Sequence, residues 1–325
     1  MGIAPEVNYI CGSPNYFKMI RLRKSLILTM FFLSGLGLSA QSLRVASYNL
    51  RYDNPGDSLD NWKYREKTVA NLIRFHDFDI FGTQEGLQHQ LEQLKADLPG
   101  YDFIGVGRDD GKEAGEHSAI FYNTEKFVLE DQGDFWLSED ATKPNKGWDA
   151  VLPRICSWGK FRVKETGFEF FFFNVHFDHV GKTARKESAR LIMEKMKAFD
   201  DAVPAILTGD FNVDQNSDSY KVLNGSKKLT DAYEKAALHY GAKGTYNGFK
   251  PDSRSDSRID HIFITDDFRV AKHGVLTDSY KTGEKELEAL ANTGNYPKEI
   301  SLYATQTRLP SDHYPVLVVL HYTTD

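Results

Sequence analysis

The chain has 325 residues, of which 41% are apolar and 13% aromatic, which is enough for a core and excludes a disordered protein. The formal net charge is −6, and beyond residue 40 it becomes −9, because 36 basic residues then face 45 acidic ones. Nucleic-acid affinity depends largely on Lys and Arg that neutralise phosphates, so this balance argues against a nonspecific polyanion binder without excluding a local basic groove.

The N-terminal segment has the pattern of an export signal. Residues 19–24 are rich in Arg and Lys, and residues 25–38 form an apolar stretch too short to span a bilayer comfortably. Ser39-Ala40-Gln41 predicts cleavage after Ala40, although Leu38 is larger than usual at its position. We expect a leader over residues 1–40, with the signal peptide at about 19–40 and a start at Met1 or Met19. The mature chain is then periplasmic or extracellular; the alternative is an uncleaved anchor.

Cysteine usage excludes two kinds of stabilisation in the mature chain. The sequence contains only Cys11, which lies in the leader, and Cys156. An internal disulfide and a cysteine metal site are therefore both ruled out beyond residue 40. No cysteine directly follows the apolar stretch, which argues against a lipoprotein.

Strand and helix patterns alternate along the rest of the chain. Strands are predicted at residues 43–49, 79–85, 117–122, 127–137, 154–163, 169–177, 203–207, 258–264, 268–276 and 314–322, and helices at 65–75, 87–98 and 182–199. Residues 214–238 mix short helical pieces, 243–257 form a Gly-rich loop, and 277–307 form a polar connection with a helix at 284–291. No linker or short repeat divides the chain, so residues 41–325 are expected to form one domain. The order predicts an α/β fold, a four-layer α-β-β-α sandwich of two mostly antiparallel sheets packed face to face.

The most informative stretch is Leu207-Thr-Gly-Asp-Phe-Asn212, which follows an apolar run. Asp210 and Asn212 are two residues apart, so in an extended chain both side chains point to one face, away from Phe211. A carboxylate and a carboxamide placed this way can orient a water molecule and donate to a phosphoryl oxygen. An ordinary turn is an equally good interpretation of this stretch alone.

Other predicted strands also begin or end in polar groups that suit metal or phosphate binding. They are Ser47–Arg51, Thr83–Glu85, Asn174–His179, Arg258–His261 and Ser311–Pro315. Ligand sites in layered α/β folds gather at strand ends, so these groups are candidates for one shared site.

The ordered series Asn49, Gln84-Glu85, His176, Gly209–Asn212, Asp260 and Ser311–His313 resembles the endonuclease/exonuclease/phosphatase superfamily, which has the DNase I-like fold. The superfamily includes nucleases, sphingomyelinases, inositol polyphosphate phosphatases and deadenylases. The resemblance covers residues 43–322 and is nearest to an uncharacterised bacterial secreted subgroup, with a more distant similarity to deadenylase-like exonucleases. It implies the four-layer sandwich and divalent-metal-dependent hydrolysis of phosphate esters.

The resemblance implies a metal site at Glu85, Asn49 and Asp312. Mg²⁺ is a hard cation that prefers oxygen ligands, and Mn²⁺ is an alternative occupant. Read without the resemblance, Glu85 is a helix-capping glutamate, Asn49 a strand-end cap and Asp312 a turn former. Whether one or two metals bind is not readable from these ligands.

The resemblance also implies the catalytic groups. His313 is the candidate general base or phosphate-binding imidazolium, and Asp260 is the carboxylate that orients it. Asp210 orients or deprotonates the water. Asn212 donates to the oxyanion of the transition state. His176 occupies the position of a phosphate-contacting residue.

Two further residues are candidates for substrate and phosphate binding. Arg154 resembles an arginine that some members aim at the phosphate, and an ordinary ion pair is its alternative role. Asp178 shares a face with His176 in an extended chain and is expected to line the pocket. His179 is interpreted as a solvated loop residue. The tryptophans Trp62, Trp136 and Trp148 are more often packing residues than a stacking wall.

These residues together predict an exported Mg²⁺- or Mn²⁺-dependent phosphodiesterase of the nuclease type, with no stable protein partner and no transmembrane span in the mature chain. The net charge favours a small nucleotide or short single strand, with an exonuclease-like mode, over duplex DNA. The alternatives are a phosphomonoesterase, a lipid or sugar headgroup phosphodiesterase, and a non-enzymatic phosphate- or glycan-binding protein that reuses the fold.

Overall fold

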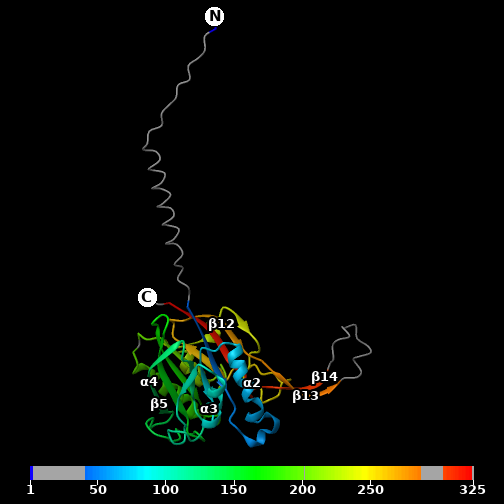
Figure 1. Ribbon diagram of the computed structural model, residues 1–325. Helices are drawn as coiled ribbons and strands as arrows, with labels where there is room; N and C mark the ends of the chain where they lie inside the picture. The colour runs from blue at the N-terminus through cyan, green and yellow to red at the C-terminus, as the bar shows by residue number, and fades with distance from the viewer. Residues whose placement is uncertain (3–40, 201, 287–302, 324–325) are drawn as a thin grey trace. The chain divides into compact units, whose positions relative to one another are not determined.

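A computed structural model of the chain describes residues 1–2, 41–200, 202–286 and 303–323 (Figure 1). The described residues from Ser42 onward form one compact unit. The predicted signal peptide lies outside the described residues, so the leader stays a prediction. Among the residues that are described, no helix has the length and apolar character needed to cross a membrane.

The first sheet has seven strands. Its order is β10 (His239–Tyr240), β12 (Arg269–Val275), β15 (Val316–Tyr322), β1 (Gln41–Asn49), β2 (Ile80–Gln84), β4 (Ile120–Asn123) and β3 (Tyr101–Ile104). β1 and β2 are parallel, with Val45 opposite Ile80 and Asn49 opposite Gln84. The carboxyl ends of these two strands therefore lie side by side.

The second sheet has six strands. Its order is β5 (Phe127–Trp136), β6 (Ile155–Val163), β7 (Glu169–His176), β8 (Ala205–Asp210), β11 (Asp260–Ile264) and β9 (Thr230–Asp231). β7 and β8 are parallel, with His176 opposite Asp210. β8 and β11 are antiparallel, with Asp260 opposite Asp210. His176, Asp210 and Asp260 are thus adjacent at one end of these three central strands.

The aromatic run of β7 shows how the layers form. Phe170 and Phe172 pack into the core between the two sheets, whereas Phe171 and Phe173 pack into the core under α4 (Lys182–Lys197) and α5 (Asp218–Asn224). Because successive strand residues point to opposite faces, an uninterrupted apolar run is what a strand buried on both faces requires.

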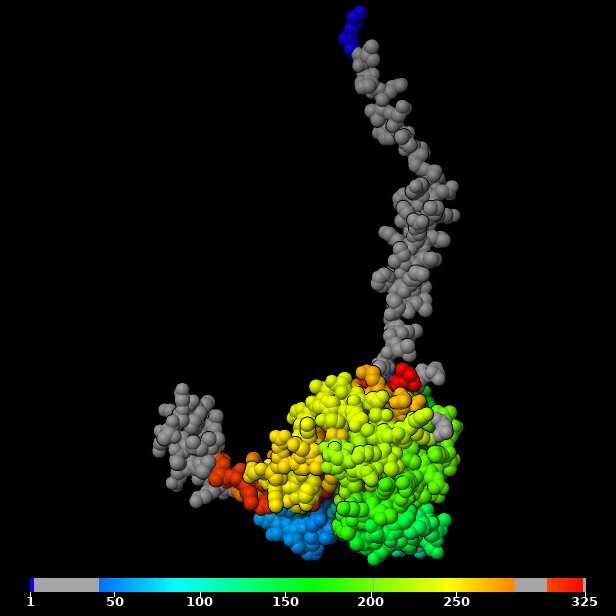
Figure 2. All heavy atoms as spheres, turned by 180° about the vertical axis from the view of Figure 1, so that it is seen from behind, coloured from blue at the N-terminus to red at the C-terminus, as the bar shows by residue number. Residues whose placement is uncertain are grey.

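The other helices complete the sandwich. α2 (Trp62–Phe75) and α3 (Gln88–Asp97) contribute apolar side chains to a third core cluster with β1, β2 and β4. A 3-10 helix, η1 (Pro55–Asp60), precedes α2, and a single-turn helix, α6 (Ala232–Lys235), follows β9. In Figure 2 the loop 243–257, in yellow, lies near the N-terminal part of the folded chain, in blue. The Cζ atom of Arg65 lies 5.4 Å from the ring centroid of Phe249 in this loop. The predicted four-layer α/β sandwich is confirmed.

Buried polar side chains connect the two sheets below the strand ends that carry the predicted site residues. Gln84 Nε2 donates to Asn174 Oδ1 at 2.7 Å, and Thr208 Oγ1 donates to the same oxygen at 3.0 Å. The sheets approach closely at Gly82, where an added Cβ would lie 2.2 Å from Asn174 Oδ1. The buried Gln84–Asn174 bond is directional and crosses between the sheets, so it fixes how one sheet is placed against the other, while the Thr208 bond lies within the second sheet and holds Asn174 in position.

The predicted helix at 284–291 is wrong over its first three residues. Residues 284–286 end β13 (Tyr280–Glu286), which pairs with β14 (Tyr303–Arg308) in an antiparallel hairpin, and residues 287–291 lie outside the described part of the chain. The hairpin satisfies its backbone by strand pairing, which local helix propensity does not anticipate. β3 and η1 were not predicted, because neither has a clear apolar period.

Candidate active site

The ends of β1, β2, β7, β8 and β11 meet around a cavity of about 520 Å³. The seven predicted site residues that line this cavity are Glu85, Arg154, His176, Asp210, Asn212, Asp312 and His313. The other three, Asn49, Asp178 and Asp260, are buried directly behind them. The structure therefore brings the whole predicted set into one region.

Asp210 is the centre of this region. Its Oδ2 accepts a hydrogen bond from Asn49 Nδ2 at 3.0 Å and lies 3.7 Å from Nε2 of both His176 and His313. Its Oδ1 accepts from the backbone N–H of Asn212 at 2.9 Å. Burial raises the pKa of Asp210, and the nearby Asp260 carboxylate raises it further.

Asn212 has a left-handed backbone with a φ of 50°, a conformation that asparagine tolerates better than most residues. This turn directs its N–H back to Asp210. The side-chain Nδ2 donates to the backbone oxygen of Phe177 at 3.0 Å. The amide therefore has a fixed position at the cavity wall.

His313 and Asp260 form a buried pair. The Nδ1 of His313 lies 2.9 Å from Asp260 Oδ2, which leaves Nε2 facing Asp210. Burial alone lowers the pKa of His313, but the Asp260 and Asp210 carboxylates outweigh burial and raise it well above its ordinary value. The predicted orienting role of Asp260 has the geometry that it needs.

His176 is in the opposite electrostatic situation. Burial, with Arg154 acting in the same direction, lowers the pKa of His176 to about 3, so the imidazole is neutral. Its Nδ1 lies 3.4 Å from Glu116 Oε2 but makes no hydrogen bond within the described residues. A buried polar atom without a partner is rare, and this one borders the cavity.

The acidic side of the cavity consists of Glu85 and Asp312. Arg51 lies between them, with Nη1 3.9 Å from Glu85 Oε2 and Nε 3.9 Å from Asp312 Oδ2, while Asp57 binds the same guanidinium at 2.9 Å. Carboxylate oxygens are the hard donors that Mg²⁺ and Mn²⁺ prefer, so the chemistry of Glu85 and Asp312 fits a divalent metal, and their role as its ligands stays a prediction. Asn49 contributes differently, because its Nδ2 donates to Glu85 at 3.1 Å, and its role as a metal ligand stays a prediction.

A second group of possible metal ligands lies close together on the same wall. One ligand atom from each of Asp210, Asp260 and His313 lies within 4.8 Å of the others, and all three side chains are buried. Because the Nδ1 of His313 is already bonded to Asp260, we interpret this group first as an acid–base network.

Arg154 supplies positive charge to the opposite wall. Its Nε lies 3.4 Å from Asp178 Oδ2 and its Nη2 lies 3.0 Å from His179 Nδ1, whereas its buried Nη1 makes no hydrogen bond within the described residues. An unpaired guanidinium N–H at a cavity wall suits a phosphate oxygen.

Asp178 is placed behind this arginine and does not line the cavity. Its Oδ1 accepts from the backbone N–H groups of Val180 and Gly181, and its Oδ2 lies 3.2 Å from the N–H of Val151. Although burial acts in the opposite direction, these backbone donors lower the pKa of Asp178. The aspartate thus holds Arg154 and the adjoining loops in place.

Several cavity residues were missed in the sequence. Glu116 and Tyr246 lie in loops without any motif, and His179, interpreted as a solvated loop residue, lines the cavity and contacts Arg154. Arg51 was visible two residues after Asn49 but carried no expected role. The tryptophans Trp62, Trp136 and Trp148 do not line this cavity.

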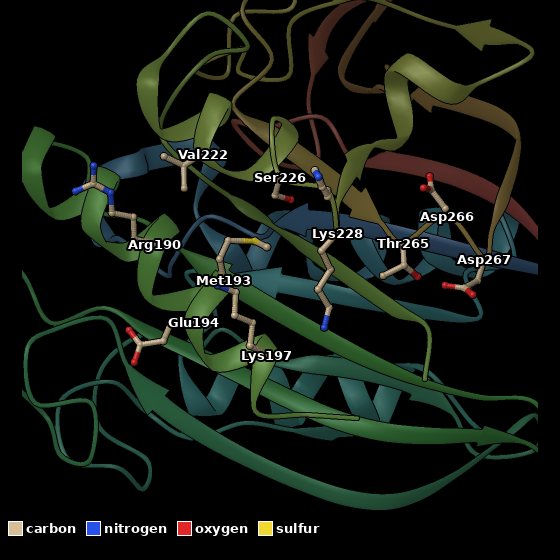
Figure 3. Close-up of a pocket in the computed structure, with 11 residues that line it drawn as sticks. Arg190, Met193, Glu194, Lys197, Val222, Ser226, Lys228, Thr265, Asp266 and Asp267 are labelled. Atoms are coloured by element: carbon tan, nitrogen blue, oxygen red, sulfur yellow. The ribbon is translucent and has the colours of Figure 1, made fainter. Parts of the chain in front are cut away.

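A larger cavity of about 850 Å³ lies at the other end of β8 and β11 (Figure 3). It is bordered by the second half of α4 and by Thr265, Asp266 and Asp267, which follow the last residue of β11. Basic and acidic side chains both border it, and none of the expected site residues is among the described residues that line it. The chemistry of the chain is therefore concentrated at the smaller cavity.

Comparisons with known proteins agree with this geometry. The profile of the endonuclease/exonuclease/phosphatase family matches residues 46–313. A solved family protein from Bacteroides thetaiotaomicron is 53% identical, with a TM-score of 0.80 and coverage of 88% of this chain and 100% of that chain. A mannosyl-6-phosphatase from the same organism is 54% identical, with a TM-score of 0.78 and coverage of 86% and 99%.

A more distant relative is the CCR4-Not complex 3'-5'-exoribonuclease subunit of Emericella nidulans. It is 22% identical over 368 residues, which cover 86% of this chain and 52% of that protein. This similarity confirms the expected distant relation to deadenylase-like exonucleases.

Proposed function

Because the chain belongs to the endonuclease/exonuclease/phosphatase family, whose members hydrolyse phosphoesters, we propose that it removes the phosphate group from a phosphorylated sugar. This proposal replaces the phosphodiester substrate that the sequence favoured with one of its alternatives, a phosphomonoester. The observation that carries it is the 54% identity to a mannosyl-6-phosphatase over almost that entire protein.

The cavity supports a small monoester. A space of about 520 Å³ accommodates one monosaccharide phosphate, and the unpaired Nη1 of Arg154 provides a donor for a phosphate oxygen. A phosphomonoester carries up to two negative charges, which suits a cavity with the guanidinium of Arg154 on one wall and that of Arg51 on the opposite side.

The positions of the side chains support the following reaction. Asp210 holds the attacking water, and His313, oriented by Asp260, polarises it. Asn212 and Arg154 donate hydrogen bonds to the phosphoryl oxygens as negative charge develops. When Mg²⁺ or Mn²⁺ is bound at Glu85 and Asp312, it supplies Lewis-acid charge at the phosphoryl group.

A substrate panel tests the proposal. The purified protein is assayed with Mg²⁺, Mn²⁺ or EDTA on mannose 6-phosphate, p-nitrophenyl phosphate, bis-p-nitrophenyl phosphate and a short single-stranded oligonucleotide. We expect metal-dependent release of phosphate from the two monoesters. Activity on the diesters alone contradicts the proposal and supports the phosphodiesterase that the sequence favoured.

Arg154→Lys tests the phosphate contact. Lysine keeps the charge but loses the fork that binds Asp178, His179 and phosphate together, so we expect kcat/KM for the monoester to fall by about 100-fold. Arg162→Lys in the neighbouring strand β6 is the matched control, because Arg162 forms a surface pair with Glu130. Equal activity of wild type and Arg154→Lys contradicts this role.

We also propose that the protein is exported, on the basis of the N-terminal pattern of residues 19–40. Cell fractionation is expected to find it outside the cytoplasm, with Gln41 as the first residue of the mature chain. A cytoplasmic protein with an intact leader contradicts this proposal.

A further inference from the structure

Glu116 places a carboxylate at the cavity wall that the proposed reaction does not use. It lies in the loop between β3 and β4, and its side chain is 17% exposed, toward the cavity. The buried Arg108 binds both of its oxygens, with Nη1 2.6 Å from Oε2 and Nη2 2.8 Å from Oε1. This two-point contact holds the carboxylate plane in one orientation.

The loop that carries this pair is anchored to two other parts of the chain. The backbone N–H of His117 donates to the oxygen of Gly86 at 2.9 Å, directly after the metal-site residue Glu85. Trp136 Nε1 donates to the backbone oxygen of Arg108 at 2.8 Å. The loop is also tightly folded, because an added Cβ at Gly107 would lie 2.2 Å from the oxygen of Ala114. Glu116 is therefore fixed relative to the catalytic groups.

The charge of the pair suits a neutral part of the substrate. A lone carboxylate at this wall would repel a phosphate group, but Arg108 neutralises Glu116 at close range. Each carboxylate oxygen bonds one guanidinium N–H and keeps a lone pair for a second donor. Beside it, the Nδ1 of His176 makes no hydrogen bond within the described residues. The wall thus offers several hydrogen-bonding positions and no net charge.

Hydroxyl groups match this arrangement, since each can donate to a carboxylate and accept from a neighbouring N–H. We propose that Glu116, held by Arg108, binds hydroxyl groups of the sugar ring and selects polyhydroxylated phosphomonoesters. This inference rests on the proposed function and adds to it the group that recognises the sugar. A role limited to orienting His176 would need a hydrogen bond between the two side chains, and the 3.4 Å contact is not aligned as one.

Glu116→Gln tests the inference through a ratio. The measured quantity is kcat/KM for mannose 6-phosphate divided by kcat/KM for p-nitrophenyl phosphate, which has no hydroxyl groups on its leaving group. Hydrogen bonds to a charged acceptor are the strong ones, so we expect the ratio to fall by about 10- to 100-fold. Glu113→Gln, an exposed glutamate in the same loop, is the matched control and is expected to keep the wild-type ratio.

Deoxy analogues of the sugar phosphate identify the contact. In the wild type, loss of the contacted hydroxyl lowers kcat/KM, whereas in Glu116→Gln the same loss has little further effect, because the two changes remove one interaction. Thermal unfolding verifies that Glu116→Gln is folded. If Glu116→Gln does not fold, Glu116→Asp, which keeps the charge but shortens the side chain, is used in its place.

The outcomes separate this inference from the proposed function. If the wild type hydrolyses neither monoester, the proposed function fails and the inference fails with it. If the wild type is active and the ratio is unchanged in Glu116→Gln, the inference alone is overturned. Equal losses on both substrates leave the ratio unchanged and therefore also overturn the inference, because Glu116 would then support the shared phosphoryl chemistry and not the sugar.

Discussion

Replacement of Asp260 by Asn tests the catalytic network at its most buried point. The substitution keeps the size of the side chain and removes the charge that lies 2.9 Å from His313 Nδ1. If the amide oxygen faces His313, the new NH₂ group lies at the position of Oδ1, which is buried and has no hydrogen-bond partner among the residues that the structure describes. If the amide turns over, it donates to Nδ1 and imposes the tautomer that carries its proton on Nε2.

The expected loss follows from the geometry. Opposite charges about 4 Å apart interact by about 4 kcal/mol at an effective dielectric constant of about 20. Without this interaction, His313 loses both its orientation and its basicity, so kcat is expected to fall by roughly 10³-fold. The assay is metal-supplemented hydrolysis of p-nitrophenyl phosphate, with kcat and KM measured separately. KM should change little, because Asp260 does not line the cavity.

Asp252→Asn is the control, since Asp252 is exposed in the nearby loop and is expected to keep wild-type kcat. Circular dichroism and thermal unfolding establish that Asp260→Asn is folded. A folded Asp260→Asn protein that retains more than a tenth of the wild-type kcat would refute the reasoning, because His313 would then not depend on its buried partner.

Three further predictions concern stability and are measured by urea unfolding. Arg65→Met removes hydrogen bonds to four backbone oxygens near the site and should lower the free energy of unfolding by about 4 kcal/mol, unlike Arg74→Met on the exposed face of the same helix. Gly82→Ala forces a Cβ to 2.2 Å from the facing sheet and should cost about 3 kcal/mol, whereas Gly274→Ala, with its nearest atom at 3.7 Å, should cost less than about 1 kcal/mol. Burial lowers the pKa of His273 from 6.5 to about 4, so below pH 6.5 the unfolded chain binds a proton that the folded chain does not. Stability contributed by this residue should therefore fall by about 2 kcal/mol between pH 7 and pH 4.5, a drop that His273→Gln should lack.

Much of the fold could be predicted because local patterns survive in the folded chain. The stretch 169–177, with its aromatic run, was predicted as a strand, and the structure shows that the two faces of this strand pack into separate cores. The hairpin of β13 and β14 could not be predicted in this way. Its strands are polar, and each is stabilised by a partner more than ten residues away in the sequence.

The site likewise contains residues that could be predicted from the sequence and residues that could not. Asp210, Asn212 and His313 carry their chemistry in short motifs at strand boundaries, so residue type and spacing were enough to nominate them. Glu116 and Arg108 belong to a loop without a motif, and their pairing is visible only as distances of 2.6 and 2.8 Å. Asp178 was expected at the cavity, but backbone donors from two loops hold it behind Arg154.

The sequence by itself determined where most of the long strands lie and which acids, amides and imidazoles are placed at their ends, since periodicity and residue chemistry are local properties. Tertiary structure alone decided which of these groups touch, which face the cavity and which are left without a partner. Those properties depend on how two separately paired sheets are joined, at Gly82 and Asn174, across almost a hundred residues of sequence. A contact formed over that separation has no signature in either segment alone.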